Sequence, residues 1–432
     1  MQAAVPRTSI AERTRARVDR RLMPFLFACY IVANLDRANV GFAALRMSRE
    51  LGFSDAVFGF GGGIFFVGYF LLEIPGTVLV EVWSARKWIA RIMLTWGFLA
   101  SATGWIHSPG QFYWIRFFLG VAEAGFFPGL VVYISHWYRP EDRGKAVAMF
   151  MAAIPASQIV GAPVAAMLLR AHWWGYDGWR WLLTLEGLPA IALGIATLFY
   201  LTDRPQQARW LPQEEREWLA AELERERAAR TRHHSAWKAL RNPHVLLLAL
   251  ILFFGLTPNY GLSLWLPQMV QRASAFGASK VSLIAAIPYL CALPLMLLTG
   301  WHSDRSGERK WHTAMPRLVS AAALTACFFS IEHVWLMVVM LSLATVGFYC
   351  AHPGFWPLPN LFLGRAAAAA SIGLINSFGN LGGFLGPYAI GWLSERTGGF
   401  RASMLLLAGC AYASGLLVSQ VGVTRAKTGH RQ

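Results

Sequence analysis

The sequence predicts an all-α membrane protein whose twelve transmembrane helices form two six-helix halves. Of its 432 residues, 56% are hydrophobic and only 14% are charged, whereas about a quarter of the residues of a soluble domain are charged. Twelve apolar segments can each cross a bilayer core of about 30 Å, and one charged stretch divides them six from six. This composition excludes a soluble enzyme, and the 28 Phe, 19 Trp and 12 Tyr exclude a disordered chain.

Each apolar segment is interpreted as a helix because it supplies roughly 20 predominantly apolar residues. The first follows an Arg-rich stretch and is too long for the core of a signal peptide, so it is expected to be retained. In the central charged stretch, Glu and Arg recur three and four positions apart, which predicts a solvated surface helix with intrahelical ion pairs. The predicted spans are 22–43, 57–80, 88–106, 110–134, 145–169, 180–201, 244–270, 281–301, 313–331, 334–358, 366–393 and 402–422.

The distribution of positive residues predicts the orientation in the membrane. Twelve alternating spans place 29 of the 39 Lys and Arg residues on the side of both termini and 8 on the other side. Because cytoplasmic loops carry an excess of Lys and Arg, both termini are predicted to be cytoplasmic, in a cell (inner or plasma) membrane. The net charge of +16 is then mostly explained by the Lys and Arg residues of the cytoplasmic loops. A nucleic-acid partner is not expected, since its binding would need the positive charge on one face.

The two halves look like repeats. The segment at 81–88 (EVWSARKW) matches the segment at 304–311 (DRSGERKW) at an offset of 223 residues, and a Pro-Gly pair recurs at nearly the same offset. The predicted organisation is therefore an N-terminal bundle over 1–202, a charged linker over 203–243 and a C-terminal bundle over 244–432. The five cysteines lie inside apolar segments, so neither a disulfide framework nor a metal site is expected, and no cofactor is implied.

Several strings resemble the major facilitator superfamily. Residues 300–310 (GWHSDRSGERK) are close to its signature loop between the second and third helices of a half, whereas the first-half copy is degraded, with Glu81 at the acidic position and Ser84 where glycine is usual. This resemblance implies two parallel six-helix repeats with a substrate site at the midplane between them.

Within the superfamily, the chain is similar to the anion:cation symporter family, which includes bacterial permeases for sugar acids, tartrate and phthalate and the sialin-like and vesicular glutamate carriers. The resemblance implies proton coupling, with the equivalents of Asp36 and Glu123 as proton carriers and that of Arg37 in anion binding. The strings that carry it are 34–39 (NLDRAN), 69–75 (YFLLEIP), 116–129 (RFFLGVAEAGFFPG), 260–268 (YGLSLWLPQ) and 376–387 (NSFGNLGGFLGP).

Charged residues inside the spans each need a reason, because an ionisable group at mid-membrane costs at least about 2.5 kcal/mol. At 1.5 Å per residue, Asp36 and Arg37 lie roughly 10 Å below the outer end of the first helix, and Arg116 enters the fourth helix at about the same depth. Arg116 and Glu123 are two turns apart and share a face. Since the resemblance makes the first and fourth helices neighbours, these four side chains are predicted to form one polar cluster.

Such a cluster predicts coupling between an anion and a proton. A carboxylate substrate that competes for an arginine would loosen the ion pair of the acid and favour its protonation. The alternative is a static salt-bridge network that holds the half together. Glu73 is equally compatible with lining the cavity and with bonding inside the bundle, and Glu186 is interpreted as structural.

Further residues are candidates for contact with the substrate or for gating. The substrate candidates are the polar residues inside spans, whose hydroxyl and amide groups pair with carboxylates without adding charge: Tyr69, Gln158, Tyr260, Asn376 and Asn380. The gating candidates are expected to form cytoplasmic latches: Glu81, Arg86, Lys87, Gly300, Asp304, Arg305, Gly307, Arg309 and Lys310.

The sequence thus predicts a monomeric secondary transporter, without enzymatic activity, that carries a small organic anion inward with protons by alternating access. The anion is expected to be a carboxylate such as a sugar acid, a tartrate-like dicarboxylate or an aromatic acid. Two alternatives stay open: an organic anion exchanger without proton coupling, and a transporter-like sensor that binds a ligand without moving it.

Overall fold

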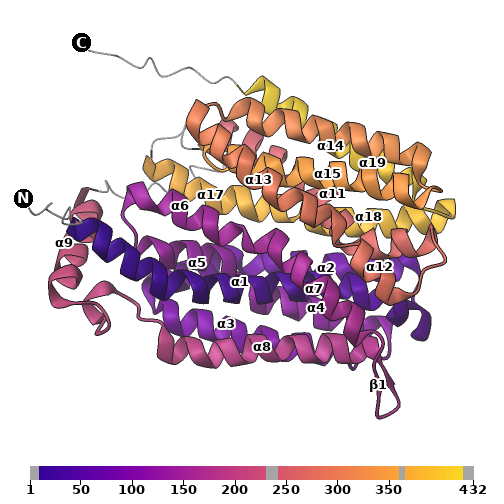
Figure 1. Cartoon of the computed structure of the whole chain (residues 1–432), viewed down its shortest axis with the longest axis horizontal. Helices are drawn as coiled ribbons and strands as arrows, with labels where there is room; N and C mark the ends of the chain where they lie inside the picture. The colour runs from indigo at the N-terminus through magenta and orange to yellow at the C-terminus, as the bar shows by residue number, and fades with distance from the viewer. Residues whose placement is uncertain (1–8, 230–241, 360–364, 422–432) are drawn as a thin grey trace, which may run out of the picture. The chain divides into compact units, whose positions relative to one another are not determined.

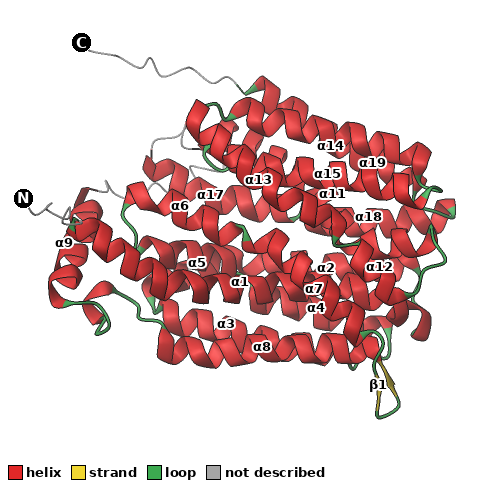
Figure 2. Ribbon diagram, viewed as in Figure 1, coloured by secondary structure: helices red, strands yellow, loops and turns green. Residues whose placement is uncertain are grey.

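The computed structural model describes residues 9–229, 242–359 and 365–421, which are almost entirely helical (Figure 2). The sheet that they contain is a hairpin of two short strands, β1 (His172–Trp173) and β2 (Tyr176–Asp177). Two compact units are found: unit 1, drawn from 1–232 and 263–286, and unit 2, drawn from 233–262 and 287–432. The bundle boundaries predicted at 202 and 243 stay a prediction.

Unit 1 contains the first six predicted spans (Figure 1). Its elements are α1 (Ile10–Glu50), α2 (Asp55–Val82), α3 (Ala85–Thr103), α4 (Pro109–Glu123), α5 (Phe126–Ser135), α6 (Pro140–Met151), α7 (Ala153–Leu168), α8 (Gly178–Tyr200), the 3-10 turn η1 (Pro205–Gln207), α9 (Gln213–Ala229) and α12 (Ala278–Ile284).

Unit 2 contains most of the last six spans. Its elements are α11 (Pro243–Arg272), whose residues from Ser263 onward belong to unit 1, then α13 (Ile287–Ser306), α14 (Lys310–Ser330), α15 (Val334–Phe355), α17 (Arg365–Asn380), α18 (Gly382–Thr397) and α19 (Arg401–Gln420).

All twelve predicted spans are helical, which confirms the all-α membrane fold. Within the described residues, nine helices, counting some broken pairs as one, are long and apolar enough to cross a membrane. The remaining predicted spans correspond to α1, α3 and the pair α17 and α18. The first helix is much longer than the predicted 22–43, because a capping box between Ser9 and Glu12 starts it on the polar side of the apolar segment.

Three of the predicted spans are broken where a proline follows. Pro128, Pro155 and Pro288 each lack the N–H that would bond the carbonyl four residues earlier. Those carbonyls belong to Met151 and Ile284, the last residues of α6 and α12, and to Ala124, which directly follows the last residue of α4. The structure therefore has two consecutive helices in each of the spans predicted as continuous over 110–134, 145–169 and 281–301. A fourth span, 366–393, is interrupted at Leu381, between α17 and α18.

Glycines allow the helices of unit 1 to approach closely. A Cβ on Gly120 would lie 1.9 Å from the carbonyl oxygen of Phe65, and one on Gly68 would lie 2.3 Å from that of Phe117. The backbones of α2 and α4 are therefore in direct contact, as small residues permit in membranes. This contact fixes the position of α4, and with it the depth of the charged side chains that α4 carries.

The helix predicted in the charged linker is present as α9, but its ion pairs mostly reach other helices. Arg143 of α6 binds Glu226 through Nη1 at 2.7 Å, and Arg17 of α1 pairs with Glu215 at 3.2 Å. The apolar side chains of Leu219 and Leu223 are buried. The prediction of a solvated helix with intrahelical pairs was therefore wrong in part, because α9 contacts α1 and α6 of its own unit.

Candidate functional site

The structure brings the predicted charged side chains of α1 and α4 together inside unit 1. Arg37 Nη2 lies 2.6 Å from Glu123 Oε1, which makes an ion pair between the two helices. Asp36 interacts electrostatically with Arg116, Glu123 and Arg37, with Arg116 the strongest of the three. The four residues are hereafter called the charged cluster.

The charged cluster lies within the helix bundle. Asp36, Arg116 and Glu123 are 5%, 2% and 0% exposed, whereas the side chain of Arg37 keeps 17% of its surface exposed. The two acids therefore do not face lipid. Arg37 is the member of the cluster that solvent reaches most easily, and it is also the direct partner of Glu123.

Aromatic rings separate and support the two guanidinium groups. The Cζ atoms of Arg37 and Arg116 lie 5.3 and 4.9 Å from the centre of the Phe65 ring, and Arg37 also lies 5.2 Å from the ring of Tyr69. These distances are typical of cation–π contacts. The ring of Phe65 thus stabilises both cations without neutralising either of them.

A break in the fourth span positions Glu123. Glu123 is the last residue of α4, Ala124 leaves the helical conformation with ψ 134°, and Gly125 adopts a left-handed backbone with φ 81°. The end of a helix carries a partial negative charge, which disfavours a carboxylate there. Arg37 supplies the cation that compensates this charge, so the break and the ion pair belong to one arrangement.

Several polar atoms of the charged cluster have no hydrogen-bond partner in the described part of the chain. They include Asp36 Oδ2, Glu123 Oε2 and the Nε and Nη1 atoms of Arg116. Leaving a buried polar atom unpaired costs about 1–3 kcal/mol. Donors of a guanidinium and acceptors of two acids are therefore available to an anion, to protons or to water.

The predicted substrate residues divide between the units. In unit 1, Tyr69 is buried beside Arg37, and Gln158 Nε2 reaches Ser263 Oγ at 3.5 Å. In unit 2, the hydroxyl of Tyr260 donates to Asn380 Oδ1 at 3.4 Å, and Asn376 is buried nearby in sequence on α17. The predicted substrate residues of unit 1 therefore include charged side chains, whereas those of unit 2 are neutral hydroxyl and amide groups.

Two further polar residues of unit 1 have buried polar atoms, one in electrostatic contact with Asp36 and one near it in sequence. Glu186 of α8 interacts electrostatically with Asp36, and neither of its carboxylate oxygens has a hydrogen-bond partner among the described residues. Asn39 follows Asp36 by three positions on α1, is fully buried, and has both amide atoms unpaired within the same part of the chain. The i, i+3 spacing from Asp36 is the sequence signal that could have identified Asn39.

Arg317 of α14 is a buried arginine that the sequence analysis did not single out, although it lies inside the predicted span 313–331. Its Nη1 atom donates to Ser414 Oγ at 2.6 Å and to the carbonyl oxygen of Ile251 at 3.3 Å. Gly255 leaves the space for it, because a Cβ there would lie 1.4 Å from Nη1. Neutral dipoles of unit 2 therefore hold this cation in place.

The loop before α14 is folded by its own polar residues. Asp304 pairs with Arg309 at 2.7 Å, and Gly307 takes the left-handed conformation, φ 67°, that the turn requires. Glu308 caps α14 by accepting the backbone N–H groups of Trp311 at 2.7 Å and His312 at 3.0 Å. Partial burial raises the pKa of Glu308, but these hydrogen bonds and His312 outweigh it, so the pKa lies below its ordinary value.

The remaining gating candidates around this loop have smaller contacts. Arg305 lies over the ring of Trp301 at 5.5 Å, and Lys310 lies 5.6 Å from the ring of Trp311. A Cβ on Gly300 would touch Pro353 of α15 at 3.3 Å. These contacts keep the loop close to the ends of α13, α14 and α15.

The corresponding loop of the first half uses an acid from the linker. Ser84 Oγ and the backbone N–H of Arg86 both donate to Asp203, each at 2.8 Å, and Ser84 also caps α3. Ser84 has an extended backbone, φ −158°, so glycine is not needed there. Lys87 lies over Trp83, whereas the side chain of Glu81 is outside the described part of the structure.

Comparisons with known proteins identify the family of the chain. The family model of the Major Facilitator Superfamily matches residues 26–387. A protein of Agrobacterium vitis named as a tartrate transporter is 43% identical over 94% of this chain and 90% of its own length. A quinolone resistance transporter of Acinetobacter baumannii is 40% identical over 90% of each chain.

The fold is also shared with solved structures. The crystal structure of a D-xylose-proton symporter superposes with a TM-score of 0.75 at 15% identity, over 95% of this chain and 99% of that one. A likeness at this identity shows the twelve-helix fold alone. Taken with the family match over most of the chain, it shows that the chain belongs to the Major Facilitator Superfamily and is a multi-pass membrane transporter, not an enzyme.

Proposed function

We propose that the protein takes up a small organic anion bearing a carboxylate, together with protons, by alternating access. A sugar acid, a tartrate-like dicarboxylate or an aromatic acid fits this proposal. The names of two relatives support the substrate class alone, since tartrate is a dicarboxylate and quinolone drugs also carry a carboxylate. We also propose that the protein acts as a monomer in the cell (inner) membrane with both termini in the cytoplasm.

The observation that carries the proposal is the ion pair between Arg37 and Glu123, buried beside Asp36 and Arg116. A substrate carboxylate that binds Arg37 and Arg116 replaces Glu123 as the partner of Arg37. Glu123 then sits unpaired at the end of α4, where the ionised form is unfavourable. It takes up a proton, and release of the anion restores the ion pair and expels the proton.

Neutral polar residues complete the proposed site. Tyr69 and Gln158 of unit 1, and Tyr260, Asn376 and Asn380 of unit 2, would donate hydrogen bonds to hydroxyl and carboxylate oxygens of the substrate. A single carboxylate would engage the arginines, and these donors would select among the anions that bear it.

The predicted latch residues are proposed to tie the helix ends together and to release them as the protein changes state. The pairs Asp304–Arg309 and Asp203–Arg86 support this role. The first joins the end of α13 to the start of α14, and the second joins the segment after α8 to the start of α3. Arg305, Lys310, Lys87 and the turn glycines Gly300 and Gly307 accompany them, together with Glu81. Single substitutions among these residues are expected to alter turnover more than substrate affinity.

Uptake by proteoliposomes under an imposed pH gradient tests the proposed coupling. For the wild type, an inward proton gradient accelerates accumulation of labelled tartrate or another carboxylate that binds. Glu123→Gln abolishes this acceleration but retains exchange against internal anion, because the neutral amide mimics the protonated acid. The matched control is Glu222→Gln on the exposed side of α9.

Other outcomes would contradict the proposal. Uptake that ignores the gradient and needs internal anion would identify an exchanger. Binding without any uptake would identify a ligand sensor.

A further inference from the structure

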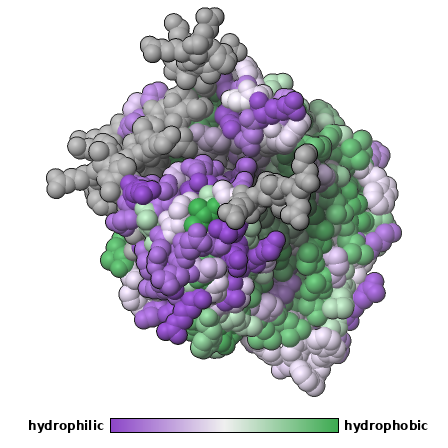
Figure 3. Space-filling view, turned by 60° about the vertical axis from the view of Figure 1, so that its left-hand side comes forward, coloured by the Kyte–Doolittle hydropathy of each residue, from purple (hydrophilic) through white to green (hydrophobic). Residues whose placement is uncertain are grey.

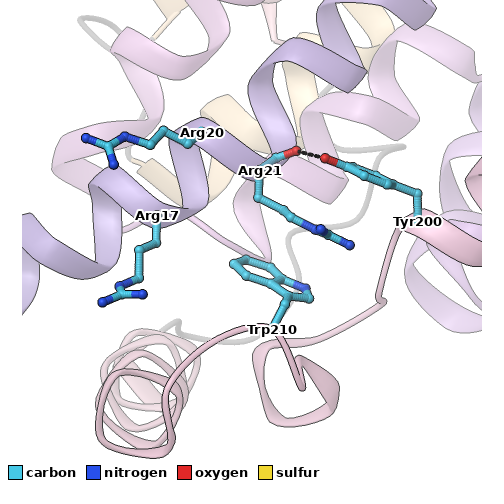
Figure 4. A pocket seen from close by; sticks show the side chains of 5 residues that line it. All are labelled: Arg17, Arg20, Arg21, Tyr200 and Trp210. Atoms are coloured by element: carbon cyan, nitrogen blue, oxygen red, sulfur yellow. Dashed lines mark hydrogen bonds between the residues drawn. The ribbon is translucent and has the colours of Figure 1, made fainter.

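A pocket of 340 Å³ opens at the polar end of α1, far along the helix from the charged cluster. Its lining residues are Arg17, Arg20 and Arg21 of α1, Tyr200 at the end of α8, and Trp210 in the segment before α9 (Figure 4). No acidic residue is among those five. We propose that this pocket binds a phosphate group, and that an anionic phospholipid headgroup or a soluble organic phosphate is the molecule that carries it.

Aromatic rings hold Arg21 in place. Its Cζ atom lies 4.2 Å from the ring centre of Tyr200 and 5.7 Å from that of Trp210, and the hydroxyl of Tyr200 donates to the carbonyl oxygen of Arg21 at 2.9 Å. Figure 4 shows the indole of Trp210 below the guanidinium of Arg21. Ring faces orient a guanidinium without neutralising its charge, so Arg21 is available to bind an anion.

Unpaired donors point to an anionic ligand. Arg21 Nε and Trp210 Nε1 are buried atoms without a hydrogen-bond partner in the described ranges of the chain. Among those residues, neither Arg20 nor Arg21 forms an ion pair with a carboxylate. A phosphate oxygen would satisfy these donors, and guanidinium groups suit phosphate because they can donate two parallel hydrogen bonds.

The third arginine is already partly neutralised. Arg17 Nε lies 3.2 Å from Glu215 Oε2, and the carboxylate is buried while 54% of the side chain of Arg17 stays exposed. This pair joins α9 to α1 through one of the residues that line the pocket. The positive charge available to a ligand therefore comes mainly from Arg20 and Arg21.

The position of the pocket favours a lipid as the source of the phosphate. Arg21 directly precedes the apolar part of α1, and Tyr200 ends α8, which is long and apolar enough to cross a membrane. Arg, Tyr and Trp at the ends of spans lie at headgroup level, where basic pockets bind anionic lipids. Figure 3 shows hydrophilic residues gathered toward this end of the molecule, with hydrophobic residues along the adjoining flank.

Native mass spectrometry of the full-length protein in detergent tests the proposal. The probes are phosphatidylglycerol, phosphatidylcholine with the same acyl chains, and soluble glycerol 1-phosphate. The wild type is expected to retain phosphatidylglycerol in preference to phosphatidylcholine. Arg20→Ala, at an exposed position without a partner to lose, should weaken that retention about fivefold, the effect expected for one basic residue at an anionic surface.

Two further variants distinguish binding in this pocket from a nonspecific attraction between the lipid and any positive residue. Arg225→Ala removes an exposed arginine of α9, whose side chain is 78% exposed, and should leave retention unchanged. Arg20→Lys should restore part of the retention, since it restores the charge but not the paired donors.

The arms of the experiment distinguish the two sources of phosphate. Soluble ligands also fill the phosphate site if millimolar glycerol 1-phosphate displaces the lipid. The same conclusion holds if glycerol 1-phosphate binds alone and Arg20→Ala abolishes that binding. Equal retention of both lipids by the wild type, or retention of phosphatidylglycerol in Arg20→Ala and in the double variant Arg20→Ala and Arg21→Ala that equals that of the wild type, would overturn the proposal. These results do not depend on which anion the protein transports.

Discussion

Unit 1 and unit 2 each bury an arginine deep in a helix bundle, but they hold it in different ways. Arg116 lies among Asp36, Glu123 and Arg37, and two of its nitrogen atoms lack a hydrogen-bond partner in the described residues. Arg317 donates twice from Nη1, to a serine hydroxyl and to a backbone carbonyl oxygen, and Nε is its only buried nitrogen atom without a hydrogen-bond partner in the described residues. Both are at most 3% exposed, so burial alone does not distinguish them.

The difference between the two arginines shows what a working site needs. A cation held by fixed neutral dipoles can be static, because those dipoles neither titrate nor leave. A cation shared among carboxylates can exchange partners when a substrate carboxylate arrives, and the displaced acid can then bind a proton. We therefore expect substitutions near Arg116 to change transport and substitutions near Arg317 to change stability.

The largest effect is expected for Arg37→Ala. It removes the direct partner of Glu123 and leaves that acid buried without a cation 2.6 Å away. Breaking a buried ion pair by removing one partner costs about 3–5 kcal/mol, and uptake should fall to the level of empty liposomes. Thermal unfolding and uptake assays measure both consequences.

A double variant controls for misfolding in that experiment. Arg37→Ala combined with Glu123→Ala should recover part of the lost stability without recovering uptake, because no unpaired charge then remains. Additive losses of stability in the double variant would show that the two residues do not form the pair described here.

A smaller effect, on stability alone, is expected for Ser414→Ala. The variant removes the acceptor that lies 2.6 Å from Arg317 and leaves a buried donor unsatisfied, which costs about 1–3 kcal/mol. The concentration of substrate at half-maximal uptake should stay within about twofold of the wild type. Ser419→Ala on the same helix, an exposed position, is the matched control.

Gly125→Ala tests the break in the fourth span. Alanine at φ 81° should cost about 1–2 kcal/mol, because a left-handed backbone brings Cβ close to the next carbonyl. The strain would shift Glu123 and lower uptake as well as the melting temperature. Gly409→Ala, at a helical position with open space around it, should be neutral or slightly stabilising, and a similar loss there would contradict the explanation.

The smallest effect is expected for Glu308→Gln at the start of α14. Because the pKa of Glu308 is lowered in the folded protein, its stabilisation is present above the ordinary carboxyl pKa of about 4.3 and is lost as the pH falls below that value. The variant should be less stable near neutral pH and should lose less stability on acidification. Unfolding measured across pH 3–7 tests this, with the exposed Glu332→Gln as control; parallel profiles for wild type and Glu308→Gln would refute it.

Local sequence patterns were enough to predict the helices, because each span is predominantly apolar. The charged cluster needed more: the two-turn spacing of Arg116 and Glu123 places them on one face, but only the family resemblance made the first and fourth helices neighbours. The break after Glu123 was not predicted, because apolar residues continue across it; the carbonyl that Pro128 leaves unbonded was the available signal.

Other features depend on tertiary contacts that a single sequence does not reveal. The contacts of Arg317 were not predicted, because its partners Ile251 and Ser414 are 66 and 97 positions away. Asp203 reaches Arg86 across 117 positions, and Trp210 reaches Arg21 in the same way. Long-range pairs of this kind require the packing of helices to be known.

Proton uptake on binding tests the exchange of partners most directly. A carboxylate that binds, such as tartrate, is added to the purified protein in weakly buffered solution, and the change in pH is recorded together with the binding heat. The account predicts that the wild type takes protons from solution as the anion binds, and that Glu123→Gln binds the anion with reduced or no proton uptake. Anion binding with no proton uptake in the wild type, or proton uptake by Glu123→Gln equal to that of the wild type, would contradict it.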